Sequence, residues 1–203
     1  RSTLAGDTED LAVVELEPQT LWEKTRPGGE WTYVPNQALL DRVTSFPLAK
    51  LMHGIGQPVG GVVADPVEHL SLLKGTAEQL RPAWVSEHLS FNRVDSGGMA
   101  VEAGFLLPPQ QQPSGVRVAA SNIRSYGTAL GRPVAFETGV NYLRPGDTER
   151  SDGRFWREVA DGADCGVLLD LHNLWCNELN GRASVMEVID QLPLERVWEV
   201  HLA

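Results

Sequence analysis

Apolar residues along the chain fall into short runs that alternate with longer stretches in which apolar positions recur every three or four residues. The short runs are rich in Val, Leu, Phe or Trp and predict β-strands at residues 11–17, 48–55, 82–91, 132–138, 166–173 and 196–202. The longer stretches predict helices at residues 37–45, 66–80, 114–130, 152–162 and 183–191, with starts at Asp65-Pro66 and Ser151-Asp152. This alternation is typical of an α/β protein with a parallel sheet, either doubly wound or closed as a barrel.

Segments rich in Gly and Pro interrupt the alternation without dividing the chain. Residues 26–31 and 106–115 have the composition of loops rather than of linkers between domains. Because 203 residues can bury a substantial core, we expect residues 1–203 to form a single domain. The Gly-rich stretch 53–61 lacks the spacing of a dinucleotide fingerprint or a P-loop, so its glycines are expected to let the backbone approach a ligand or turn sharply.

Polar side chains recur near the C-terminal end of every predicted strand, on the face opposite a run of apolar side chains. The series consists of Glu17, His53, His88, Glu137, Asp170 and His201. Successive members are between 31 residues (170 to 201) and 49 residues (88 to 137) apart, and most separations equal about one strand-helix unit. In a parallel sheet these groups would reach the same end, and in a (β/α)8 barrel that end carries the active site.

The residue types in this series predict a metal site. Buried ionisable groups are costly unless they are paired or bound to a cation, and imidazoles with carboxylates are usual ligands of Zn, Mn and non-haem Fe. Glu199 shares a face with His201 and is either a ligand or a salt-bridge partner, and Glu17 is favoured over Glu15 as the group on the first strand. Glu87 falls on the opposite face, towards the helices, and His69 is expected to be a structural residue of a helix.

Composition and charge narrow the range of partners. The formal net charge of −10 argues against a nucleic-acid partner, since that binding depends on clustered Lys and Arg. The apolar runs are far shorter than the roughly 20 residues that span a bilayer, and no signal-like leader opens the chain, so we expect no membrane contact and a cytoplasmic protein. Two cysteines, Cys165 and Cys176, give neither a disulfide framework nor a CxxC pair.

Five ordered motifs carry a resemblance that covers most of the chain from about Leu11. The motifs are "LMHGIGQPVGG", "WVSEHLSF", "AFETGVNYL", "GVLLDLHNLW" and "VWEVHLA". In this order and spacing they resemble the DUF692 family, the multinuclear non-haem iron-dependent oxidative enzymes that modify ribosomally made peptides. The resemblance implies a TIM barrel, related to xylose isomerase and endonuclease IV, that holds two or three iron ions at its C-terminal face.

The resemblance also implies roles for individual residues. The residues that look like metal ligands are His53, His88, Glu137, Asp170, His172 and His201. Glu137 is similar to the carboxylate that bridges ions, and Glu137 and Asp170 are the implied catalytic groups. His172 stands where many members have Asn, and Thr138 replaces the Asn that commonly follows the glutamate. Glu17, Glu199 and Asn173 are further candidates for the site.

The implied activity is an oxidation that uses O2. A substrate peptide would bind iron, often through a cysteine thiolate, and a partner protein commonly presents the leader peptide to enzymes of this family. Two other hypotheses stay open. One is a Zn-, Mn- or Mg-dependent sugar isomerase or phosphoester hydrolase of the same barrel type. The other is an inactive fragment, because about six strands are predicted where a closed barrel has eight, and family members continue into further segments with ligands.

Overall fold

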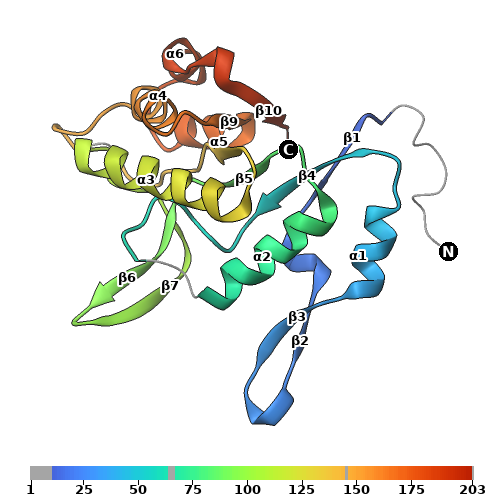
Figure 1. Cartoon of the computed structure of the whole chain (residues 1–203). Helices are drawn as coiled ribbons and strands as arrows, with labels where there is room; N and C mark the ends of the chain where they lie inside the picture. Colours follow the sequence, from blue (N-terminus) through green and yellow to red (C-terminus); the bar gives the residue numbers. More distant parts are fainter. Residues whose placement is uncertain (1–10, 64–66, 145, 203) are drawn as a thin grey trace.

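The computed structural model describes residues 11–63, 67–144 and 146–202, and its centre is a curled sheet of six parallel strands (Figure 1). In spatial order the strands are β1 (Val13–Leu16), β4 (Ala49–Gly54), β5 (Val85–His88), β8 (Val134–Glu137), β9 (Gly166–Asp170) and β10 (Val197–His201). Each strand falls within or close to one of the six predicted runs. The order follows the sequence, as in part of a (β/α)8 barrel, so the predicted α/β fold with a parallel sheet is confirmed.

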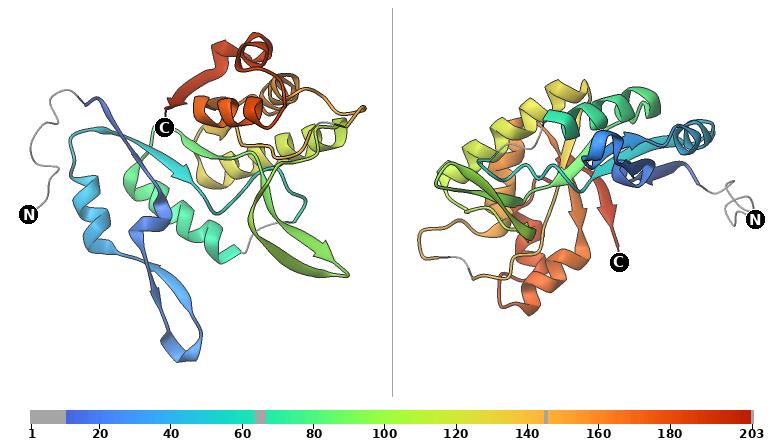
Figure 2. Two further views of the ribbon diagram at one scale, coloured as in Figure 1. Left: turned by 180° about the vertical axis from the view of Figure 1, so that it is seen from behind. Right: turned by 90° about the horizontal axis from the view of Figure 1, so that it is seen from below.

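Most helices pack side by side along the convex side of the sheet (Figure 2), whereas the helix Leu171–Leu179 directly follows β9 at the carboxyl end of that strand. The helices are α1 (Gln37–Thr44), α2 (Val67–Leu80), α3 (Pro113–Leu130), α4 (Asp152–Ala163), α5 (Leu171–Leu179) and α6 (Val185–Gln191). Local sequence accounts for several ends. Helix α4 begins at the predicted Ser151-Asp152, α6 carries a capping box between Ser184 and Glu187, and α3 ends at Gly131 with φ +63°. The predicted start at Asp65-Pro66 lies outside the described residues.

The hydrophobic core lies between the sheet and these helices. Met52, Val85, Phe136 and Val167 leave the convex face of four neighbouring strands and are almost completely buried. They belong to the same apolar cluster as Phe155 of α4 and other helix residues. Burial of a large apolar side chain contributes about 1.5–3 kcal/mol each. Because this face supplies the core, the strands can direct polar side chains to the concave face.

Two β-hairpins, which the sequence did not predict, extend from the same end of the sheet. Strands β2 (Trp22–Thr25) and β3 (Thr32–Pro35) form the first, and strands β6 (Phe91–Ser96) and β7 (Met99–Leu107) form the second. The expected loop 26–31 is mostly the turn of the first hairpin, whereas the expected loop 106–115 is wrong at both ends, because β7 reaches Leu107 and α3 begins at Pro113. A Gly97-Gly98 turn with φ of +66° and +87° closes the second hairpin.

The predicted strand 166–173 is too long by three residues. Strand β9 ends at Asp170, whose side chain accepts a hydrogen bond from the backbone N–H of Asn173 (2.8 Å) and so caps helix α5. The apolar run continues through Leu171 into the helix, so periodicity alone did not mark the boundary. As a consequence, His172 lies in the first turn of α5 and does not share a strand face with Asp170.

Within residues 11–63, 67–144 and 146–202, no helix has both the length and the apolar character needed to cross a lipid bilayer.

The two cysteines are both free thiols, and they differ in their surroundings. Cys165 is buried at the start of β9, and burial raises the pKa of its thiol to about 12. Cys176 is partly exposed on α5. Because the thiolate is the reactive species, we expect iodoacetamide to alkylate Cys176 in the native protein and Cys165 only after denaturation. Mass spectrometry of tryptic peptides will check this, and equal labelling of both cysteines in the native state would contradict the burial of Cys165.

Candidate metal centre

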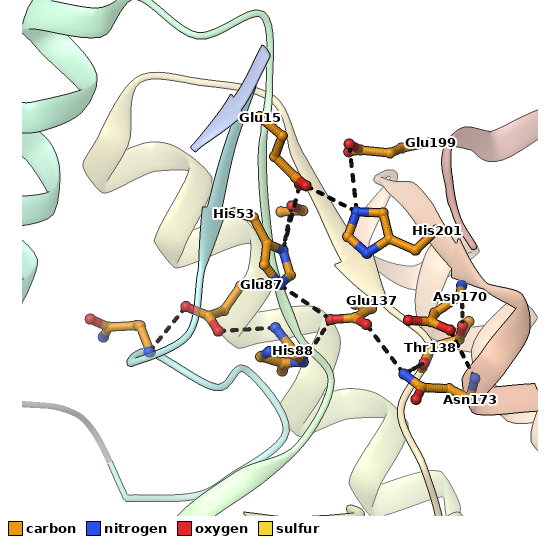
Figure 3. A network of polar contacts seen from close by, with 12 residues as sticks. Glu15, His53, Glu87, His88, Glu137, Thr138, Asp170, Asn173, Glu199 and His201 are labelled. Carbon is orange, nitrogen blue, oxygen red and sulfur yellow. Dashed lines mark hydrogen bonds and ion pairs between the residues drawn. The ribbon is translucent and has the colours of Figure 1, made fainter. Parts of the chain in front are cut away.

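Polar side chains from six strands meet on the concave side of the sheet, at the carboxyl ends of the strands (Figure 3). The sequence-predicted members are His53 of β4, His88 of β5, Glu137 of β8, Asp170 of β9 and His201 of β10. Strand register aligns them, since His88 is the pairing partner of Glu137 and Asp170 that of His201. Each lies at the last or next-to-last position of its strand, where parallel strands bring side chains together.

Glu137 lies at the middle of this cluster, and its side chain is only 5% exposed. Its Oε2 atom lies 2.7 Å from His88 Nδ1 and 3.4 Å from His53 Nε2. Its other oxygen accepts a hydrogen bond from Asn173 Nδ2 (3.2 Å), and the same amide also donates to the Thr138 carbonyl (3.0 Å). One carboxylate therefore faces two imidazoles while its orientation is fixed from the opposite side.

A second group of side chains, Glu15, Glu199 and His201, lies beside the contacts of Glu137. It includes Glu15, although the sequence favoured Glu17 as the carboxylate of the first strand. His201 Nε2 is 3.0 Å from Glu15 Oε2 and 3.8 Å from Glu199 Oε1. Glu199 also accepts a hydrogen bond from Trp84 Nε1 (3.1 Å), so it is brought into the cluster rather than left as a surface residue.

Glu17 does not join this second group. Strand β1 ends at Leu16, and Glu17 precedes the short 3-10 helix Pro18–Leu21, where its carbonyl oxygen accepts hydrogen bonds from Thr20. Pro18 was the available signal, because proline ends a strand and leaves Glu15 as the carboxylate within β1. The structure therefore brings Glu15 into the cluster in place of Glu17.

Three overlapping groups of the described residues have ligand atoms within 4.8 Å of one another. The groups are His53, His88 and Glu137, then Glu137, Asp170 and His201, then Glu15, Glu199 and His201. Glu137 belongs to two groups and His201 to two groups. Imidazole and carboxylate ligands suit Zn, Mn and non-haem Fe, and a shared carboxylate can bridge neighbouring ions. The arrangement therefore fits more than one cation.

The electrostatics of the cluster also fit a cation. Burial lowers the pKa of His53 to about 4, although the negative charge of Glu137 acts in the opposite direction. The His53 imidazole is therefore uncharged at neutral pH. Burial and the charge of Glu199 raise the pKa of Glu15 to about 7. Glu15 Oε1 is buried and has no hydrogen-bond partner among the described residues. A cation would pair these carboxylates, which are costly to bury alone.

His172 and Asn173, which are neighbours on α5, differ in their relation to the cluster. His172 Nε2 lies 3.4 Å from Cys176 Sγ, and the His172 ring packs against Trp175 at 5.9 Å between centroids. His172 belongs to none of the three groups of described residues, whereas Asn173 bonds Glu137 directly. The sequence offered a signal for this difference. When an Asp side chain caps a helix, it accepts a hydrogen bond from the backbone N–H of the third helical residue, which is Asn173 here, and not from that of His172.

Two further side chains position the cluster without belonging to a group. The Thr138 hydroxyl accepts a hydrogen bond from the Asp170 backbone N–H (3.0 Å) and is fully buried, so Thr rather than Asn stabilises this strand end. Ser86 Oγ lies 2.8 Å from His53 Nδ1 and fixes the plane of that imidazole.

Glu87 faces away from the cluster, as expected, and is completely buried. Its carboxylate accepts hydrogen bonds from the backbone N–H groups of Gln57 and His88, both at 3.0 Å. A Cβ on Gly54 would overlap Glu87 Oε2, so the glycine-rich segment allows a close approach between backbone and side chain. His69 is also outside the cluster, with its ring edge-on to Trp22.

The sheet and the cluster together define an α/β protein whose six parallel strands form part of a TIM barrel, with a candidate metal centre at the carboxyl ends of the strands. A family model described as RiPP precursor modification enzyme MbnB/TglH/ChrH matches residues 29–203. The chain therefore belongs to this family of enzymes that modify ribosomally synthesised peptides. The resemblance to DUF692 proteins noted from the five motifs is confirmed.

Individual relatives agree with this assignment. The chain is 33% identical over 167 residues to a UPF0276 protein of Chromobacterium violaceum, with 82% of this chain and 58% of the relative covered. It is 30% identical over 169 residues to a UPF0276 protein of Paraburkholderia phytofirmans, with 83% and 53% covered. The chain thus spans little more than half the length of these relatives.

Solved structures support the fold. A xylose isomerase domain protein from Planctomyces limnophilus superposes with a TM-score of 0.51 at 14% identity, covering 95% of this chain and 63% of that one.

Proposed function

We propose that the protein oxidises a ribosomally synthesised peptide in an iron-dependent reaction that uses O2, with a peptide cysteine as the group that reaches the metal. The observation that carries this proposal is the Glu137 carboxylate shared between two groups of ligand atoms. Membership of a family that modifies peptides supports the substrate class. A partner protein that presents the leader part of the peptide belongs to the same proposal.

The residues that would hold iron are those of the three overlapping groups, His53, His88, Glu137, Asp170, His201, Glu15 and Glu199. Iron bound there would supply Lewis acidity, a lower thiol pKa and, with O2, oxidising power. Two or three ions fit the number of overlapping groups. His172 is assigned no ligand role in this proposal, because its imidazole faces Cys176 instead.

The protein's own residues hold the centre in a fixed geometry. Asn173 orients the Glu137 carboxylate, Ser86 orients the His53 ring, and Thr138 holds the backbone of Asp170. Such outer contacts keep ligands in place before the substrate arrives, and their loss typically weakens metal affinity about 10–100-fold. We assign these three residues to positioning and the residues of the groups to direct contact with the metal.

Metal analysis tests the proposal most directly. Protein purified without oxygen and then loaded with iron is expected to retain at least two iron ions per chain and to consume O2 in the presence of its substrate peptide. Elemental analysis and an oxygen electrode give the two readings. Fewer than two irons per chain would overturn the multinuclear assignment, and tight binding of Zn or Mn without O2 uptake would point to a non-redox isomerase or hydrolase instead.

A further inference from the structure

A cavity of about 190 Å³ lies beside the candidate metal centre. Its walls come from the end of β5, from the segment between β7 and α3, from the segment between β8 and α4, and from α4 itself. His88 and Asn173 line it, and both also contact Glu137. A molecule that reaches the cluster would therefore lie next to this cavity.

Apolar residues make up about half of the cavity wall. The apolar residues that line it include Leu106, Val140, Phe155 and Trp156. Binding sites for whole drug-sized molecules have volumes of about 300–1,000 Å³, so a cavity of about 190 Å³ has the size for one side chain. The volume of the cavity and the apolar part of its wall favour a single large apolar side chain.

The charges in the cavity wall are already compensated. The Asp152 carboxylate pairs with Arg182, whose Nε lies 2.8 Å from Asp152 Oδ2, and it also accepts a hydrogen bond from Gln111. The side chains of Asp152 and Arg182 are each 1% exposed. A charged side chain would enter without a counter-ion from this pair and would lose its hydration, which is costly.

One polar group of a wall residue, the Ser90 hydroxyl, has no hydrogen-bond partner within the part of the chain that the structure describes. Ser90 is only 6% exposed. Buried hydroxyl groups in proteins are normally hydrogen-bonded, so the Ser90 hydroxyl would gain a partner from a ligand that reaches it. A peptide backbone carbonyl would be a suitable acceptor for this hydroxyl.

We propose that this cavity binds a large apolar side chain, aromatic or aliphatic, of the residue next to the one that reaches the metal centre. Ser90 donates its hydroxyl hydrogen to the backbone carbonyl of the bound residue. The inference rests on the proposed function for the nature of the substrate, and it adds a selection among peptides. Peptides with a charged or small residue beside the reacting cysteine are poor substrates.

Short capped peptides provide the test. Two series, acetyl-X-Cys-Gly-amide and acetyl-Gly-Cys-X-amide with X as Phe, Leu, Ala, Lys or Glu, are titrated by calorimetry into the iron-loaded protein without oxygen. In one series we expect Phe or Leu to bind roughly ten-fold or more tightly than Ala, Lys or Glu. Equal affinities for all X in both series would overturn the proposal.

Variants connect the preference to the cavity. Leu106→Trp or Val140→Phe fills the cavity and is expected to abolish the preference for Phe or Leu, whereas Leu39→Trp on α1 keeps it. Ser90→Ala is expected to weaken every peptide of the preferred series several-fold, with the exposed Ser71→Ala as the matched control. Circular dichroism selects the folded variants, and an unchanged preference in a folded, cavity-filled variant would refute the assignment.

The peptide preference of the cavity and the iron binding of the centre can fail independently of each other. If the protein binds no iron, the same titrations into metal-free protein still compare Phe and Leu with Ala. A retained preference then supports the cavity and rejects the iron chemistry. Iron binding with no preference among the peptides rejects the cavity alone.

Discussion

Glu137→Ala is expected to remove most of the iron that the protein binds. Its carboxylate lies between His53 and His88 on one side and is shared with the group of Asp170 and His201. Loss of an outer contact alone typically costs about 10–100-fold in metal affinity, so loss of this shared group should cost more than roughly 100-fold. Elemental analysis after iron loading and desalting gives the measurement.

The matched control for this variant is His172→Ala. His172 is another candidate from the sequence, but its side chain contacts Cys176 and Trp175 instead of the cluster. We expect His172→Ala to retain iron at the level of the unmodified protein. Iron kept equally by Glu137→Ala, or lost equally from both variants, would sink the assignment of the centre to Glu137.

Gly54→Ala is expected to destabilise the protein strongly, although it adds one methyl group. The new Cβ would overlap Glu87 Oε2, and the Glu87 carboxylate accepts hydrogen bonds from the backbone N–H groups of Gln57 and His88. Overpacking together with the loss of hydrogen bonds to a charged group should lower the free energy of unfolding by about 2–5 kcal/mol. Urea unfolding followed by tryptophan fluorescence measures it.

Gly75→Ala serves as the control for this second variant. Gly75 lies inside α2, and a Cβ there meets no atom within 4 Å. Alanine is the better helix former, so this variant should gain about 0.5–1 kcal/mol. The close packing of Gly54 on Glu87 is wrong if the free energy of unfolding of Gly54→Ala lies within about 0.5 kcal/mol of that of the unmodified protein. This margin is roughly the usual effect of a neutral surface substitution.

The six strands and the polar groups at their ends were predictable because one face of each strand is buried. Burial forces apolar side chains onto alternate positions, so the polar positions between them are visible in the sequence. In β8, Val134 and Phe136 enter the core while Glu137 faces the cluster. The same logic placed His53, His88 and His201 correctly on the concave face.

The hairpins and helix α5 were not predictable in this way, for two physical reasons. Most residues of β7 are exposed or half-buried, so no alternation between core and solvent marks this strand. Leu171 continues the apolar run of β9, and only the bond between Asp170 and Asn173 shows that a helix has begun. The choice between Glu15 and Glu17 depended on one residue of strand length, and Pro18 was the sequence signal that limited the strand.

The contact between His201 and Glu15 joins residues that are 186 positions apart in the sequence. Their strands, β1 and β10, are the two open edges of the sheet and share no hydrogen-bonded pairing. Closing a loop of this length has a large entropic cost, so the contact forms only after the intervening strands are ordered. An ion bound by both residues would therefore act as a clasp on the folded chain, and its capture would be one of the last steps of folding.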